Sequence, residues 1–142
     1  MLALATILIA GAVANADIRP VLREQGFEGP LNGRETITYA GNIRQGRDDY
    51  QVYTYHGVFR AAVVDHGVNR LIIMRNASTF FGQYYIPMPT RCKVRRQTVV
   101  CDTAYPGRVV RFTGSGPPDQ IWLDGEVGRF YYGKRINRQP KK

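Results

Sequence analysis

Short runs rich in β-branched and aromatic residues fill the sequence between residues 35 and 133, and turn-forming residues separate them. No stretch in this region repeats apolar residues at the spacing of an amphipathic helix. Val, Ile, Thr, Tyr and Phe favour strands, whereas Gly, Pro, Asn and Asp favour turns. The pattern predicts an all-β domain, an antiparallel meander of about eight to ten strands that forms a small barrel or sandwich.

Turn residues set the expected limits of these strands. His66-Gly67 and Asn76-Ala77-Ser78 are expected to turn the chain, and a last hairpin is expected around Asp124-Gly125. Gly57 is expected to bend the second strand. The expected strands are 35–39, 50–59 with 60–65 as its continuation, 69–75, 79–86, the two arms of 91–102, 108–113, 120–124 and 126–132.

Both cysteines of the chain lie in the segment RCKVRRQTVVCD, residues 91–102. Folding this segment about a turn at Arg96-Gln97 places Cys92 opposite Cys101, with Cα atoms about 4.5 Å apart, which is within disulfide range. A redox-active pair is more often Cys-x-x-Cys at the start of a helix. We therefore predict a structural disulfide across a hairpin. Because Arg-Gln is an uncommon two-residue turn, a wider four-residue loop is the alternative.

The first sixteen residues have the pattern of a secretory signal peptide. A short apolar run precedes Ala14-Asn15-Ala16, an A-x-A cleavage site, so the mature chain is expected to begin at Asp17. A buried N-terminal strand or helix is the alternative. We expect export to the periplasm or the extracellular space, where disulfides persist. Residues 17–34 are expected to be irregular, residues 35–133 to form the β domain, and residues 134–142 to form a disordered basic tail.

Positive charge is concentrated in the last third of the chain. The net charge is +9, and residues 91–142 hold twelve Lys or Arg against four Asp or Glu, whereas residues 17–90 hold eight against seven. Such asymmetry is typical of a chain that binds an anionic partner; solubility alone is the alternative. The predicted binding residues are Lys93, Arg95 and Arg96 of the hairpin and Lys134, Arg135, Arg138, Lys141 and Lys142 of the tail.

The two histidines, His56 and His66, are the candidate catalytic residues if the protein is an enzyme. A ribonuclease-like reaction needs a general base, a general acid and cations for the charge that develops. The histidines are ten residues apart, and a bent hairpin would bring them together. A turn histidine at 66 and a half-buried strand histidine at 56, without catalysis, is the alternative that we favour.

No sequence motif for a cofactor or metal is present, and we expect neither. Aromatic residues are frequent and occur as neighbours, as in Phe80-Phe81, Tyr84-Tyr85 and Phe130-Tyr131-Tyr132. Adjacent strand residues point to opposite faces, so one member of each pair should enter the core and the other should lie outside. Outer tyrosines beside arginines would be able to stack on sugars or bases, unless other segments cover both faces.

These observations favour an exported, non-catalytic β domain that binds an anionic polymer or envelope surface, such as polysaccharide, lipid headgroups or nucleic acid. Its binding should depend strongly on salt, because polyanions release counterions when they bind cations. One alternative is a secreted ribonuclease-like hydrolase that uses His56 and His66. Another is a periplasmic inhibitor or protein-binding module for an acidic partner. The mature chain is expected to contain no integral membrane span.

Overall fold

The computed structural model describes residues 17–102, 109–123 and 125–136. Within these residues the chain forms one short helix, α1 (Arg19–Glu24), and nine strands, so the predicted all-β fold is confirmed. The strands are β1 (Thr36–Gln45), β2 (Asp48–Ala61), β3 (Val64–Arg75), β4 (Thr79–Tyr85), β5 (Cys92–Arg95), β6 (Thr98–Cys101), β7 (Val109–Arg111), β8 (Gln120–Leu123) and β9 (Glu126–Tyr132). In this described part, no helix has the length and apolar character needed to cross a membrane.

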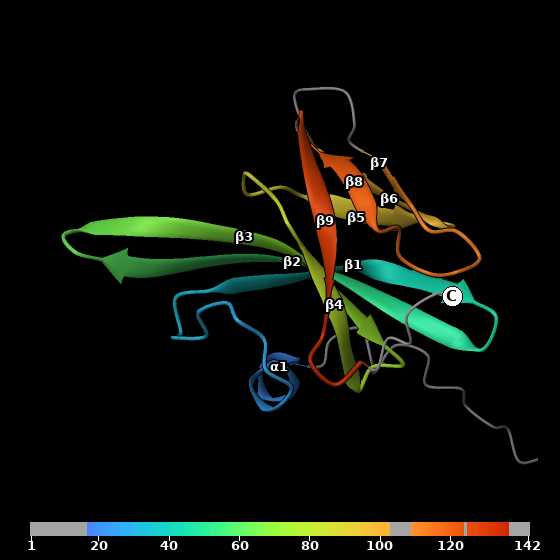
Figure 1. Ribbon diagram of the computed structural model, residues 1–142, viewed down its shortest axis with the longest axis horizontal. Helices are drawn as coiled ribbons and strands as arrows, with labels where there is room; N and C mark the ends of the chain where they lie inside the picture. Colours follow the sequence, from blue (N-terminus) through green and yellow to red (C-terminus); the bar gives the residue numbers. More distant parts are fainter. Residues whose placement is uncertain (1–16, 103–108, 124, 137–142) are drawn as a thin grey trace, which may run out of the picture.

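The strands form two antiparallel sheets (Figure 1). The larger sheet has the order β1-β2-β3-β4-β9-β8 and curves into a half-barrel, and the smaller sheet has the order β5-β6-β7. The chain therefore leaves the large sheet after β4, builds the small sheet, and returns as β8 and β9. β1 packs beside β5 and β7 packs beside β8, but the described strands share no ladder at either place.

Two apolar cores lie on opposite faces of the large sheet. The larger core fills the space between the two sheets and includes Tyr50, Val52 and the disulfide. The smaller core lies between the other face of the sheet, where Tyr53 and Tyr55 point, and the segment that contains α1. The side chains of β2 enter the two cores in this way because side chains alternate between the faces of a strand, so residues two apart share a face. Each face of the central strands is therefore covered by a different part of the chain.

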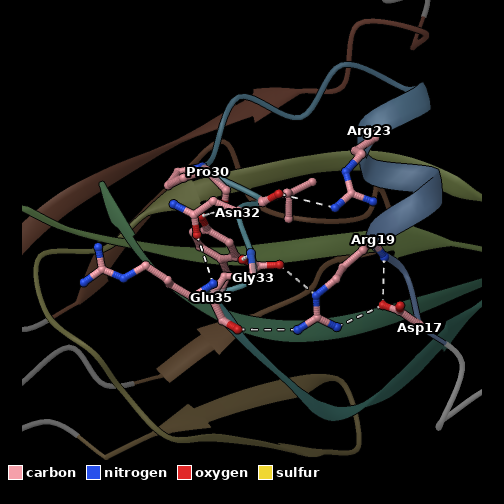
Figure 2. Close-up of polar contacts among 10 residues, drawn as sticks. Asp17, Arg19, Arg23, Pro30, Asn32, Gly33 and Glu35 are labelled. Carbon is pink, nitrogen blue, oxygen red and sulfur yellow. Dashed lines mark hydrogen bonds and ion pairs between the residues drawn. The ribbon is translucent and has the colours of Figure 1, made fainter. Parts of the chain in front are cut away.

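A buried ion pair fastens α1 to the start of β1 (Figure 2). Nε of Arg19 lies 2.9 Å from Oε1 of Glu35, whose side chain is only 1% exposed. The backbone N–H of Gly33 donates to the other carboxylate oxygen at 2.8 Å, and Nη1 of Arg19 also contacts Asp17 at 3.0 Å. Burial by itself would raise the pKa of Glu35, but hydrogen bonds from backbone N–H groups and from Arg19 outweigh it, so the pKa is lowered.

The disulfide hairpin has the predicted register. Cys92 pairs with Cys101, and the two are joined by a disulfide with Cα atoms 4.0 Å apart. β5 and β6 are joined by the two residues Arg96 and Gln97, so the narrow turn is present rather than the wider loop. Arg96 takes a positive φ of 58°, which gives this turn the twist of the flanking strands although arginine is an uncommon residue there.

The predicted turn at His66-Gly67 is wrong. β3 already starts at Val64, so both residues lie within the strand, where His66 pairs with Phe59 and Gly67 pairs with Val58. The chain instead turns at residues 62–63, where Ala62 has a φ of +55°. Cross-strand pairing continues to this point, so β2 and β3 form a long two-stranded ribbon that projects from the molecule (Figure 1).

Register shifts in the ladders account for two further differences between the expected and the observed strands. The first strand continues well beyond residue 39, because a register shift between Tyr39 and Gly41 lets pairing with β2 resume. A second shift beside Phe80 breaks the alternation expected along β4. Phe81 therefore joins Tyr84 in the larger core, while Phe80 enters the smaller core. The predicted signal peptide, residues 1–16, lies outside the described residues.

Candidate functional site

A cleft of about 710 Å³ opens between the β1–β2 pair and the disulfide hairpin. The β1–β2 pair forms one side of the cleft, and the segment from Pro89 to Arg95 forms another, together with residues 100–102. The side chains that give the cleft its chemistry are Thr36, Thr38, Thr54, His56, Arg91, Lys93, Arg95 and Asp102. The cleft therefore combines several cations with hydroxyl and imidazole groups.

The side formed by β1 and β2 is a polar continuation of the larger core. Tyr50 and Val52 are buried in that core, whereas Thr54 and His56 occupy the next positions on the same face of β2. On β1, Thr38 pairs with Thr54, and the next rung toward the ribbon pairs Thr36 with His56. Neighbouring strands lie about 4.8 Å apart, so these four side chains form a compact patch of hydrogen-bonding groups.

The opposite side of the cleft is cationic. Lys93 and Arg95 alternate with the core-facing residues of β5 and therefore share its outer face. Arg91 precedes β5, and its carbonyl accepts a hydrogen bond from the N–H of Asp102 at 2.8 Å. None of these three cations forms an ion pair with another described residue. The disulfide holds the two arms of the hairpin together at the base of this wall.

A neighbouring amide fixes the imidazole of His56. Nδ1 of His56 lies 2.6 Å from Oδ1 of Asn69, the residue opposite it on β3, and Asn69 is buried. An amide oxygen only accepts, so in this orientation Nδ1 carries the hydrogen and donates it. Nε2 is then the ring nitrogen without a partner among the described residues. The ring is therefore oriented in advance of any ligand.

The structure does not bring His56 and His66 together. His56 pairs with Asn69 and His66 pairs with Phe59, which places the histidines on opposite faces of the β2–β3 ribbon. The ring of His66 stacks on Phe59 with centroids 5.4 Å apart, and His66 is exposed. Only His56 lines the cleft. An acid–base pair of these two histidines therefore has no geometric support.

The basic residues predicted to bind a partner do not lie together in the structure. Lys93 and Arg95 line the cleft, whereas Arg96 lies exposed at the hairpin turn. Lys134 and Arg135 form ion pairs with Glu28 and Glu24, each at 3.3 Å. These contacts fasten the end of the described chain to the segment around α1. The other predicted tail residues, Arg138, Lys141 and Lys142, lie outside the described residues.

Sequence reasoning missed half of the cleft. Arg91, Asp102 and the three threonines were not singled out, although one local signal was available. Val52 is followed at alternate positions by Thr54 and His56, so the face that is apolar in the first half of β2 becomes polar in the second half. The meeting of that face with the hairpin depends on contacts between β1 and β5, which no local pattern encodes.

The part of the chain that the structure describes contains no group of three or more His, Cys, Asp or Glu side chains placed to hold a metal ion. No known protein family, curated protein or solved structure matches this chain.

Proposed function

We propose that the protein is an exported, non-catalytic β domain that binds an anionic polymer, and that the cleft beside the disulfide hairpin is its binding site. One observation carries the proposal: Arg91, Lys93 and Arg95 line the same cleft and form no ion pair with another described residue. Asp102 is the single carboxylate among the described residues that line it. The ligand is an anionic polymer or envelope surface: an acidic polysaccharide, a nucleic acid or a surface of lipid headgroups, each of which presents repeated negative charges.

The chemistry of the cleft suits such a ligand. Unpaired cations at the wall of a hollow focus a positive field, which attracts anions and speeds their association. Arginine binds carboxylate, sulfate and phosphate groups through two parallel hydrogen bonds, whereas lysine acts as a point charge. The threonine hydroxyls and His56 add hydrogen-bonding groups on the opposite side. A segment of polymer in the cleft would therefore meet charge on one side and hydrogen-bonding groups on the other.

Export is part of the same proposal. The A-x-A pattern at Ala14-Asn15-Ala16 supports cleavage before Asp17. The disulfide between Cys92 and Cys101 also supports export, since disulfides are rare in reducing compartments. Mass spectrometry of the protein recovered from a host with an oxidising compartment tests this proposal. A mature mass that starts at Asp17 is the expected result, and an uncleaved chain would contradict it.

A titration with heparin at low and near-physiological salt tests the cleft. In the double variant Lys93→Gln/Arg95→Gln we expect weaker binding and a smaller dependence on salt, because fewer counterions are released. The matched control is Arg47→Gln/Arg60→Gln, which removes the same charge from two exposed positions outside the cleft. If both double variants weaken binding equally, only the overall charge matters and the proposed site is wrong.

A hydrolase is the second candidate, favoured by the position of His56 inside a cationic cleft. Incubation with a short RNA, followed by analysis of its length, tests this alternative. If RNA is cut, His56→Ala should abolish the reaction, whereas His66→Ala should leave it unchanged because His66 lies on the other face. A salt-insensitive complex with one acidic protein would instead favour the inhibitor hypothesis.

A further inference from the structure

A second surface with a distinct composition lies on the outer face of the large sheet, away from the cleft. Tyr85 of β4, Tyr131 of β9 and Trp122 of β8 are 38%, 46% and 61% exposed. We name these three residues, together with Arg70 of β3 and Arg129 of β9, the aromatic platform. Trp122 is the single tryptophan of the chain. Large aromatic residues gathered on an exposed face are typical of binding surfaces.

The strand register places the platform residues on one face. Tyr131 pairs with Gln83, which is two residues from Tyr85 and therefore shares its face. Arg129 and Tyr131 are likewise two residues apart, and Trp122 pairs with Val127 at the next position along β9. The other residues of β9, such as Phe130, point into the larger core. On β8 and β9 the platform is thus the solvent side of strands whose opposite side packs into the larger core.

Internal contacts hold the rings of Tyr85 and Tyr131 in place. The guanidinium carbon of Arg70 lies 3.7 Å from the ring centroid of Tyr85, and Nη1 of Arg70 donates to the backbone carbonyl of Asn69 at 2.8 Å. The rings of Tyr85 and Tyr131 lie 4.9 Å apart and are tilted by 43°. A surface whose aromatic groups are already oriented loses little conformational entropy when it binds.

The charge of the platform indicates an anionic ligand. Arg129 is exposed and forms no ion pair with another described residue. The platform face of β8 and β9 carries Gln120, Trp122, Val127, Arg129 and Tyr131, and none of these is a carboxylate. Glu126 pairs with the buried Leu123 and so belongs to the other face.

We propose that the aromatic platform binds single-stranded nucleic acid, with bases stacked on Tyr131 and Trp122 and a phosphate held by Arg129. Stacking on exposed rings combined with cations along the path of the backbone is the general mode of such binding.

Trp122 provides the readout for this second site. In a titration of the protein with an eight-nucleotide oligothymidylate at low salt, we expect quenching of the tryptophan fluorescence. Tyr131→Ala should weaken binding by about 5- to 150-fold, the range found for loss of one stacked base, whereas Tyr131→Phe should retain it. Arg129→Gln should reduce the slope of log K against log salt by about 0.7. Phe59→Ala, which removes an exposed ring from the projecting ribbon, is the control and should change nothing.

Heparin separates this proposal from the proposed function, because it carries charge but no bases. Heparin should bind without quenching Trp122, and Tyr131→Ala should not affect its affinity. The cleft variant Lys93→Gln/Arg95→Gln should weaken heparin binding and leave the quenching by oligothymidylate in place. If Tyr131→Ala folds normally and binds oligothymidylate as well as the unchanged protein, the proposal is wrong. Quenching by a neutral oligosaccharide but not by oligothymidylate would also overturn it.

Discussion

Val94 packs directly against the backbone of Gly41, and this contact joins the disulfide hairpin to β1. A Cβ atom placed on Gly41 would lie 2.5 Å from the Cβ of Val94, which is far closer than van der Waals contact allows. Gly41 also has a φ of +143°, a conformation that residues with side chains rarely adopt. The edge of the cleft therefore depends on the absence of a side chain at position 41.

We expect Gly41→Ala to destabilise the fold by about 2–4 kcal/mol, because backbone strain and overpacking add. Gly46→Ala is the matched control, because Gly46 also has a positive φ but no atom lies within 4 Å of its Cβ position. This substitution should lower the free energy of unfolding by only about 1 kcal/mol. Urea unfolding gives both values. In a Val94→Gly background, which lacks the Cβ that the new methyl group would meet, Gly41→Ala should cost less than in the unchanged protein, and an equal cost would show that the clash with Val94 is not the cause.

Removal of the disulfide should lower stability without removing the cleft. Closing the loop between Cys92 and Cys101 stabilises the fold by about 2.5–3 kcal/mol in the chain-entropy model, so Cys92→Ser/Cys101→Ser should melt at a lower temperature. Below that temperature, heparin binding should be retained, because the hairpin is also held by its backbone ladder. Loss of binding by a variant that is still folded would show that the disulfide has more than a structural role.

The ion pair of Arg19 with Glu35 should make stability depend on acid pH. The pKa of Glu35 in the folded state is lowered relative to that of an unfolded glutamate, which is about 4.3. The contribution of Glu35 to the free energy of unfolding is therefore complete above about pH 4.3. It is lost as the pH falls through the folded-state pKa. Arg19→Gln leaves a buried carboxylate without its cation and should cost about 2–3 kcal/mol at pH 7. It should also flatten the decline in the free energy of unfolding between pH 5 and pH 3. An unchanged decline would mean that other carboxylates dominate acid unfolding.

Tyr55 should contribute to alkaline unfolding. Burial, supported by the nearby Glu35 and opposed by Arg70, raises the pKa of Tyr55 to about 12, and its hydroxyl donates to the carbonyl of Pro30. An unfolded tyrosine ionises near pH 10, so the unfolded state binds fewer protons between about pH 10 and 12 and stability falls there as the pH rises. The free energy of unfolding of Tyr55→Phe, measured from pH 8 to pH 11.5, should fall less steeply. Equal slopes for both proteins would contradict this assignment.

Local patterns were sufficient for the parts of this fold that are formed by neighbouring segments. The β5–β6 hairpin and its disulfide followed from alternation and from the positions of Cys92 and Cys101, and the β8–β9 pairing followed in the same way. The pairing of β4 with β9 joins segments more than forty residues apart, and no local signal marks it. The cleft depends on such a long-range contact, between β1 and β5. Of its lining residues, the sequence singled out Lys93, Arg95, His56 and the two cysteines, but not their meeting in one cleft.

The error at His66-Gly67 has a specific physical origin. Glycine often marks a turn, but it also occurs in strands where neighbouring groups approach closely. A Cβ on Gly67 would lie 3.4 Å from Cε1 of His56, so this glycine leaves room for the ring across the ladder. The actual turn at residues 62–63 contains no residue that favours a positive φ, although Ala62 adopts one. Pairing along the whole ribbon overrides the local preference.

The two sheets meet without a hydrogen-bonded ladder between β1 and β5 and between β7 and β8. Backbone hydrogen bonds between the described strands therefore do not fix the distance between the sheets at these two places. A barrel closed by backbone hydrogen bonds has a circumference fixed by the number and stagger of its strands. Here the spacing between β1 and β5 is set by side-chain contacts such as that of Val94 with Gly41. The cleft can therefore widen or narrow through the repacking of a single side chain, with every backbone ladder intact. In the proposed complex with a polymer, the volume of the side chain at position 94 should therefore limit the thickness of the chain that the cleft accepts.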